Sequence, residues 1–203
     1  MTGKIKLNAT SGGGSVSFQA PSSTGDDRVI TLPTTADGTV LTTTNPKAGN
    51  IIQVVQTFKK DAFSESVGAQ NASSVCMSVN ITPTSATNKL LIKAVVHMSS
   101  SSASNSIGFN FSKDGTEQPL ADADGNRIRC TGVGGNERNY YVTPLVAEYL
   151  VTAGGTSQQT WGVMLRSGSG GTQTIKLNRS SLDDNGNGNL LPASSITIYE
   201  VAG

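Results

Sequence analysis

Hydrophobic residues recur along this chain in short runs that alternate apolar with polar positions. No window of about eleven residues or more places them at the i, i+3, i+4 and i+7 spacing of an amphipathic helix. Clusters of Gly, Asn, Asp, Ser and Pro, the residues that favour turns, separate the runs. This pattern predicts an all-β chain.

Most of the expected strands lie in residues 50–203, which we interpret as one globular head. About ten strands in a domain of this size are typical of a β-sandwich or jelly roll. Residues 89–98 are the most apolar, so we expect a central strand buried on both faces. The expected strands are 51–58, 62–67, 75–82, 89–98, 106–113, 127–131, 140–150, 158–166, 172–178 and 195–201.

Residues 1–49 form a thinner region with few large apolar side chains. The alternation predicts short strands at 4–8, 15–20, 28–32 and 39–43. Fewer than about 50 residues with so little to bury rarely fold alone. We therefore expect an extended attachment or shaft segment that other chains help to order.

The last expected strand, 195–201, is apolar on both faces. Ile196 and Ile198 lie on one face, and Tyr199 and Val201 lie on the other. A terminal strand of this kind needs a cover on each side, one from the core and one from another sheet or subunit. We expect Tyr199, Val201 and Tyr149, which lies in a similar strand, at an interface between copies of the chain.

Composition excludes several classes of partner. Ser, Thr, Gly and Asn make up 86 of the 203 residues, charged residues are 14%, and the net charge is +1. Such a chain has no general electrostatic attraction to nucleic acid or to an anionic membrane. No apolar run approaches the length of a membrane-spanning helix, and the first eight residues lack the apolar run of a signal peptide, so neither feature is expected.

The sequence offers little for catalysis, so we expect a non-enzyme with no cofactor. The single histidine, His97, lies in an expected buried strand and is interpreted as a structural residue with satisfied hydrogen bonds. Cys76 and Cys130 are too few for a metal site or a disulfide framework. We favour two small thiols and leave a single bridge between them open.

Two polar loops are weak candidate sites. Asp122, Asp124 and Asn126 place oxygen ligands at alternate positions, but Gly125 precedes the third and no later Glu completes a calcium loop, so an ordinary turn is favoured. A second loop contains Asp183, Asp184, Asn185 and Asn187. It can be an exposed recognition loop or a solvated connection, and the second interpretation is favoured.

Aromatic residues are concentrated in the last third of the chain: Tyr140, Tyr141, Tyr149, Trp161 and Tyr199. Core packing or an oligomer interface is the favoured interpretation, because aromatic side chains dominate both. Stacking on sugar rings is the alternative.

Four segments carry a family resemblance. Residues 30–56, 84–92, 113–116 and 194–202, in this order and spacing, resemble fibre proteins of marine tailed bacteriophages. The later part also resembles the trimeric jelly-roll heads of the tumour necrosis factor and complement type. The resemblance implies a homotrimeric virion protein without catalytic activity. Its residues 1–49 would dock on another virion protein, and its head would bind a glycan or protein on the host surface.

Three alternatives remain open at this stage. A head fibre or capsid-decorating protein, which stabilises the shell or gives weak adhesion, fits the same residues. A secreted tumour necrosis factor-like binding head lacks its expected signal peptide. A glycoside hydrolase needs two carboxylates about 5–10 Å apart, and the sequence cannot test that pairing.

Overall fold

Two compact units, residues 1–40 and 41–203, make up the computed structural model of the chain. All regular elements in the described part are β-strands, so the all-β prediction is confirmed. None of the described elements is a long apolar helix of the kind that crosses a membrane. The expected boundary between residues 49 and 50 stays a prediction. The structure describes residues 4–8, 10–19, 25, 46–102, 105–138, 140–182 and 190–203.

A β-hairpin of β1 (Lys4–Asn8) and β2 (Ser15–Gln19) lies in the smaller unit. Its register places Ile5 opposite Phe18, and these side chains are 66% and 49% exposed. A two-stranded hairpin alone is marginally stable in water, so this pair gains little from its own packing. The expected strands at 28–32 and 39–43 lie outside the described residues.

In its described residues the larger unit, which we call the head, contains eleven strands. They are β3 (Ile51–Lys59), β4 (Phe63–Val67), β5 (Ala72–Ile81), β6 (Lys89–Ser100), β7 (Asn105–Lys113), β8 (Thr116–Gln118), β9 (Gly132–Asn136), β10 (Thr143–Thr152), β11 (Gln159–Ser167), β12 (Gln173–Leu177) and β13 (Ser194–Val201).

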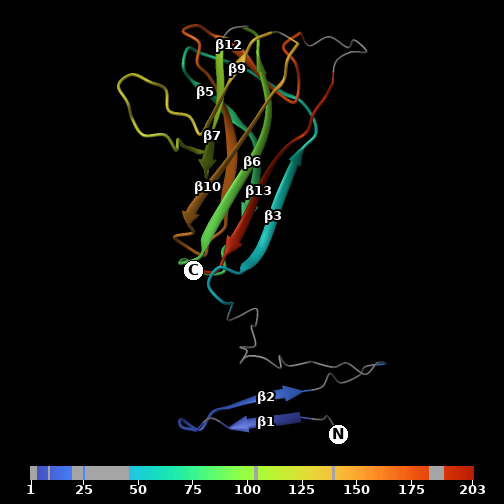
Figure 1. Cartoon of the computed structure of the whole chain (residues 1–203), viewed down its shortest axis with the longest axis vertical. Helices are drawn as coiled ribbons and strands as arrows, with labels where there is room; N and C mark the ends of the chain where they lie inside the picture. Colours follow the sequence, from blue (N-terminus) through green and yellow to red (C-terminus); the bar gives the residue numbers. More distant parts are fainter. Residues whose placement is uncertain are drawn as a thin grey trace, which may run out of the picture. The chain divides into compact units, whose positions relative to one another are not determined.

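Eight of these strands form a jelly roll (Figure 1). One sheet, here the β6 sheet, has the order β3-β13-β6-β10; β12 continues the β13 edge of β6, and β4 pairs with β12. The other, the β11 sheet, has the order β5-β11-β7-β9, with β8 also paired to β7. When the eight strands are numbered in chain order, the first pairs with the eighth (β3 with β13) and the second with the seventh (β5 with β11). The third pairs with the sixth (β6 with β10) and the fourth with the fifth (β7 with β9), and all four pairs are antiparallel. Rolling up one long antiparallel hairpin gives this nesting, which is the jelly-roll arrangement.

Side chains from the two inner faces fill the core. Alternate residues of β6, from Leu90 to Met98, are fully buried, as their period of two requires. On the facing sheet Phe109 and Phe111 contact each other edge to face, with ring centroids 5.8 Å apart. Trp161 is 1% exposed and belongs to the same core. Residues 89–98 are central in their sheet, but only one face is fully buried, so the expectation of two buried faces is wrong.

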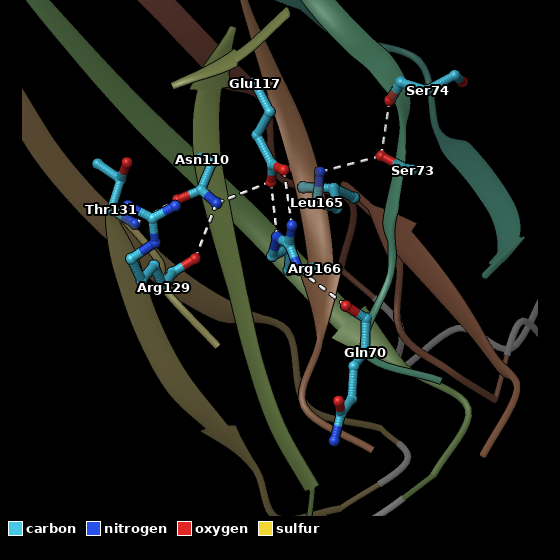
Figure 2. Close-up of polar contacts among 9 residues, drawn as sticks. All are labelled: Gln70, Ser73, Ser74, Asn110, Glu117, Arg129, Thr131, Leu165 and Arg166. Carbon is cyan, nitrogen blue, oxygen red and sulfur yellow. Dashed lines mark hydrogen bonds and ion pairs between the residues drawn. The ribbon is translucent and has the colours of Figure 1, made fainter. Parts of the chain in front are cut away.

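Polar contacts connect side chains on the outer face of the β11 sheet with neighbouring segments (Figure 2). Asn110 on β7 points outward yet is buried, because residues 129–131 lie against it. Its Nδ2 donates to the Arg129 carbonyl at 3.0 Å, and its Oδ1 accepts from the Thr131 amide at 2.6 Å. Arg166 donates two hydrogen bonds to Glu117, both 2.6 Å, and a third to the Gln70 carbonyl. All of these hydrogen bonds are formed within one chain.

The strand expected at 127–131 is wrong: β9 begins at Gly132 instead. Its sequence, Gly-Val-Gly-Gly-Asn, has a low intrinsic preference for β structure, which is why the pattern misplaces it. Close packing explains the glycines. A Cβ at Gly132 would lie 2.6 Å from the Phe109 ring, and one at Gly134 would lie 2.8 Å from Leu145.

Candidate functional site

The outer face of the β6 sheet is the candidate site. It consists of the outward positions within 54–58 on β3, 195–201 on β13, 91–95 on β6 and 146–150 on β10, which alternate with the core residues; His97 and Pro144 form the next row, beyond this surface. The antiparallel register aligns these positions into rows that run across the four strands. We call this surface the apolar face.

Two rows of the apolar face are hydrophobic. One contains Val54, Tyr199, Leu91 and Leu150, which lie opposite one another in that order. The other contains Phe58, Ser195, Val95 and Val146. Four of these residues are more than half exposed: Val54 at 52%, Phe58 at 58%, Val146 at 57% and Leu150 at 60%.

Exposed apolar side chains are unusual when several of them lie next to one another. Single exposed apolar side chains are normal on a soluble protein, whereas rows of them on neighbouring strands mark an interaction surface. Ile51, which is 60% exposed and pairs with Val201, extends the surface toward the end where residues 46–50 lead into β3. Each square ångström of this surface removed from water would stabilise an assembly by about 25 cal/mol.

A polar row separates the two hydrophobic rows. Gln56 donates a hydrogen bond to the Thr197 hydroxyl at 2.8 Å, and Lys93 forms an ion pair with Glu148 at 3.1 Å. The register places these residues side by side across the sheet. Both charges in the row have a partner in the same chain, so covering the face would not bury an isolated charge.

The predicted interface residues divide between the two faces. Tyr199 and Val201 lie on the apolar face and are half-buried in the single chain. Tyr149 lies on the inner face, where its ring centroid is 6.4 Å from that of Phe111 and 6.1 Å from that of Trp161. Its side chain packs against the core, so we do not retain it as an interface candidate. The residues that replace it on β10 are Val146 and Leu150.

Most of the apolar face could not be predicted from the sequence. Both β10 and β13 are apolar on both sides, and alternation alone does not show which side meets the core. The alternation of Val54, Gln56 and Phe58 on β3 was the available signal, because a half-buried strand with apolar residues at its outward positions needs a second cover.

The loop that contains Asp122, Asp124 and Asn126 shows the features of a turn. The Asp124 carboxylate pairs with the Arg127 guanidinium, and the Arg127 amide donates to the Asp124 carbonyl at 3.2 Å. In the part of the chain that the structure describes, no group of three or more His, Cys, Asp or Glu side chains could hold a metal ion. The second loop, with Asp183, Asp184, Asn185 and Asn187, lies outside the described residues.

Cys76 and Cys130 are both free, so the open question of a bridge is answered in favour of two thiols. Burial raises the pKa of the Cys76 thiol to about 12, and it also raises the pKa of Cys130. A thiol with a raised pKa is a poor nucleophile at neutral pH. His97 is half-buried, and its Nδ1 has no hydrogen-bond partner among the described residues, so the expectation of a satisfied histidine is wrong.

Glu200 is a buried carboxylate at the end of β13, on the inner face. Its Oε1 accepts from the Thr84 amide at 2.7 Å and from Asn88 Nδ2 at 2.6 Å, and its Oε2 accepts from Gln53. Burial acts to raise the pKa of Glu200, but hydrogen bonds from Asn88, Gln53 and Thr84 together hold the pKa below its usual value. All these partners are neutral, so the cluster ties β3, β13 and residues 84–88 together.

Comparisons with known proteins give no family. No family model matches the chain, and no curated protein matches it. Solved structures of infectious bursal disease virus are similar to it. The Gt strain structure is 12% identical, covers 93% of this chain and 48% of its own, and has a TM-score of 0.41. The T=1 particle structure is 14% identical, covers 93% and 46%, and has a TM-score of 0.40.

The chain spans about half the length of these solved chains. The strand pairing described above defines the jelly roll independently of these structures.

Proposed function

We propose that this protein is a structural component of a virus particle, a homotrimeric fibre whose head binds the host surface. Three copies associate through the apolar face of the β6 sheet. Residues 1–49 attach the fibre to another virion protein. The activity is binding rather than catalysis.

The apolar face is the single observation that carries the proposal. Val54, Phe58, Val146 and Leu150 are each more than half exposed and lie in two rows on one sheet. A second copy of the same chain fits this face, because the face is apolar, carries no unpaired charge in its polar row and bears the predicted interface residues Tyr199 and Val201. Threefold association comes from the resemblance to trimeric jelly-roll heads.

The chain enters the head next to its last strand. The Gly49 amide donates to the Ala202 carbonyl, and the Ala202 amide donates to the Asn50 carbonyl, both at 2.9 Å. In the proposed fibre, the attachment segment is therefore continuous with the head beside β13.

Light scattering on a sizing column tests the assembly. A solution mass near three times 20.9 kDa, about 63 kDa, is expected. A stable species of 20.9 kDa at all protein concentrations would overturn the trimeric fibre. A second experiment tests the partner of the head. The labelled chain is expected to bind host cells and not empty capsids. Binding to capsids, with a rise in their melting temperature, would favour the decoration role.

A further inference from the structure

A pocket of about 420 Å³ opens at the end of the head opposite to residues 46–50. It lies where β6 ends and β10 and β13 begin. His97 is eight residues along β6 from Lys89, which corresponds to about 26 Å of extended chain. The volume falls in the range of about 300–1,000 Å³ that is typical of small-molecule sites.

Two tyrosines form the aromatic part of the pocket. Tyr140 and Tyr141 are 49% and 46% exposed, and their ring centroids are 4.7 Å apart at an interplanar angle of 78°. Edge-to-face contact fixes each ring against the other. Each ring therefore keeps a large apolar surface in water, held in place before any ligand arrives. Pro144 and Leu190 add apolar surface around the rings, and Leu190 is 84% exposed.

His97 lies in the polar part of the pocket. Its Nδ1 is buried and has no hydrogen-bond partner among the residues that the structure describes. An unsatisfied buried polar atom is costly, and such atoms in native proteins call for an explanation. Because Nδ1 is buried, a ligand in the pocket meets the polar groups at its surface rather than this atom. Ser180, and the hydroxyl groups of the two tyrosines, add further polar groups to the lining.

Charge narrows the class of ligand. The described lining contains no Asp, Glu, Lys or Arg side chain. Among these described lining residues an ionic ligand finds no counter-charge, whereas a neutral ligand with a flat apolar face and several hydroxyl groups matches both parts of the lining. A pyranose ring has these properties: its C–H face packs on an aromatic ring, and its hydroxyl groups hydrogen-bond to the polar groups beside it.

We propose that this pocket binds a neutral sugar ring of a host-surface glycan. The inference rests on the proposed host-binding function and deepens it, because it names the site and the class of ligand. Tyr140 and Tyr141 hold the ring by stacking, and the tyrosine hydroxyl groups exchange hydrogen bonds with the hydroxyl groups of the sugar. Three pockets in a trimer would raise the avidity of weak single contacts.

Saturation-transfer NMR on the full chain tests the site. The probes are methyl α-glucopyranoside, methyl α-mannopyranoside, methyl β-galactopyranoside and N-acetylglucosamine, each at millimolar concentration. At least one should receive magnetisation from the protein. The double variant Tyr140→Ala/Tyr141→Ala should bind that sugar at least about tenfold more weakly, because the stacking surface is lost.

Two matched variants separate binding from folding. Tyr141→Phe keeps the ring and should retain the signal within a few-fold. Val133→Ala truncates a side chain that is 66% exposed on the β11 sheet, and it should leave the signal unchanged. Silence from all four probes, or a signal that survives in the double variant, would overturn the proposal. If the unmodified chain binds no sugar and the double variant no longer assembles, the proposal is also overturned. The pocket would then be a contact between copies of the chain.

Light scattering on the same samples distinguishes this proposal from the fibre proposal. If the chain is a trimer but binds none of the probes, the sugar-site proposal fails and the assembly proposal stands. If the chain is a monomer that binds a sugar through Tyr140 and Tyr141, the sugar-site proposal stands and the trimeric fibre fails.

Discussion

The two sheets of the head have outer faces with the same strand geometry and different chemistry. On the β11 sheet the outward side chains include Asn110 and Arg166, which hydrogen-bond to Glu117 and to the backbone of their own chain. On the β6 sheet the outward side chains include Val54, Phe58, Val146 and Leu150, and all four are more than half exposed.

The difference teaches how a sandwich divides its two surfaces. Period-two alternation is required on both sheets because each needs one apolar face for the shared core. It leaves the outward positions unconstrained. Outward side chains that hydrogen-bond to one another complete their surface within one chain, whereas contiguous rows of exposed apolar side chains mark an interaction surface.

The largest expected effect comes from adding charge to the apolar face. The double variant Val146→Lys/Leu150→Lys should convert the trimer to a folded monomer, because three copies of each lysine would be buried without a partner. Light scattering measures the mass, and circular dichroism checks the fold. Val133→Lys, at a position 66% exposed on the β11 sheet, is the control and should stay trimeric. An unchanged mass in the double variant would contradict the assignment of the interface.

Removing the guanidinium from the β11 sheet should have the next largest effect. Arg166→Ala should lower the free energy of unfolding by about 2–3 kcal/mol, because the partly buried Glu117 carboxylate keeps only the Asn110 donor and the Gln70 carbonyl loses the guanidinium. Urea unfolding measures the loss. Arg166→Lys keeps the charge but cannot form the paired hydrogen bonds, so it should give an intermediate value. A loss below about 0.5 kcal/mol in Arg166→Ala, within the range of ordinary surface changes, would show that this face is not held by the network.

Acid should weaken the head through two carboxylates. The Arg166 hydrogen bonds lower the pKa of Glu117 despite its burial, and the pKa of Glu200 is also below its usual value. A carboxylate with a lowered folded-state pKa contributes stability above its unfolded value of 4.5, and that stability is lost as the pH falls through the folded value. Urea midpoints should be nearly constant from pH 7 to about 5 and decrease below about 4.5.

Glu117→Gln provides the comparison for the acid experiment. It removes one of the two carboxylates, so stability should fall less steeply with acid below pH 4.5 than in the unmodified chain. The same slope in both chains would mean that Glu117 does not contribute to the acid sensitivity.

The smallest expected effect concerns the ion pair on the apolar face. Lys93 and Glu148 are 43% and 52% exposed in the single chain, and exposed pairs contribute less than about 1 kcal/mol. Lys93→Ala should therefore cost less than about 1 kcal/mol when it is measured by urea unfolding in the monomeric Val146→Lys/Leu150→Lys background. If its cost equalled that of Arg166→Ala, the contrast between the two faces would fail.

Much of the fold could be predicted from alternation alone. The strand expected at 195–201 matches β13 to within one residue, and the one expected at 89–98 matches the first ten residues of β6. β9 could not be predicted, because its glycines are required by the Phe109 ring and Leu145, which come from distant parts of the chain. β8 has only three residues, too few to show a period.

The candidate site could be predicted only in part. β10 has apolar residues at both parities, with Tyr149 on one side and Val146 and Leu150 on the other. A shift of one residue in its pairing with β6 would exchange the two faces, so the register decides which residues meet the core. Tyr149 faces inward because it lies opposite Ile92, and this pairing is formed between strands about 57 residues apart in the chain.

The hydrogen bonds between residues 49–50 and Ala202 mean that the head starts and finishes its path at one place. A domain with adjacent ends can be spliced into a loop of an unrelated scaffold without stretching either partner. Because its ends are adjacent, the head can be exchanged between proteins as one unit. On the proposed function, exchanging residues 50–202 between fibres would change the binding specificity and leave the attachment segment unchanged.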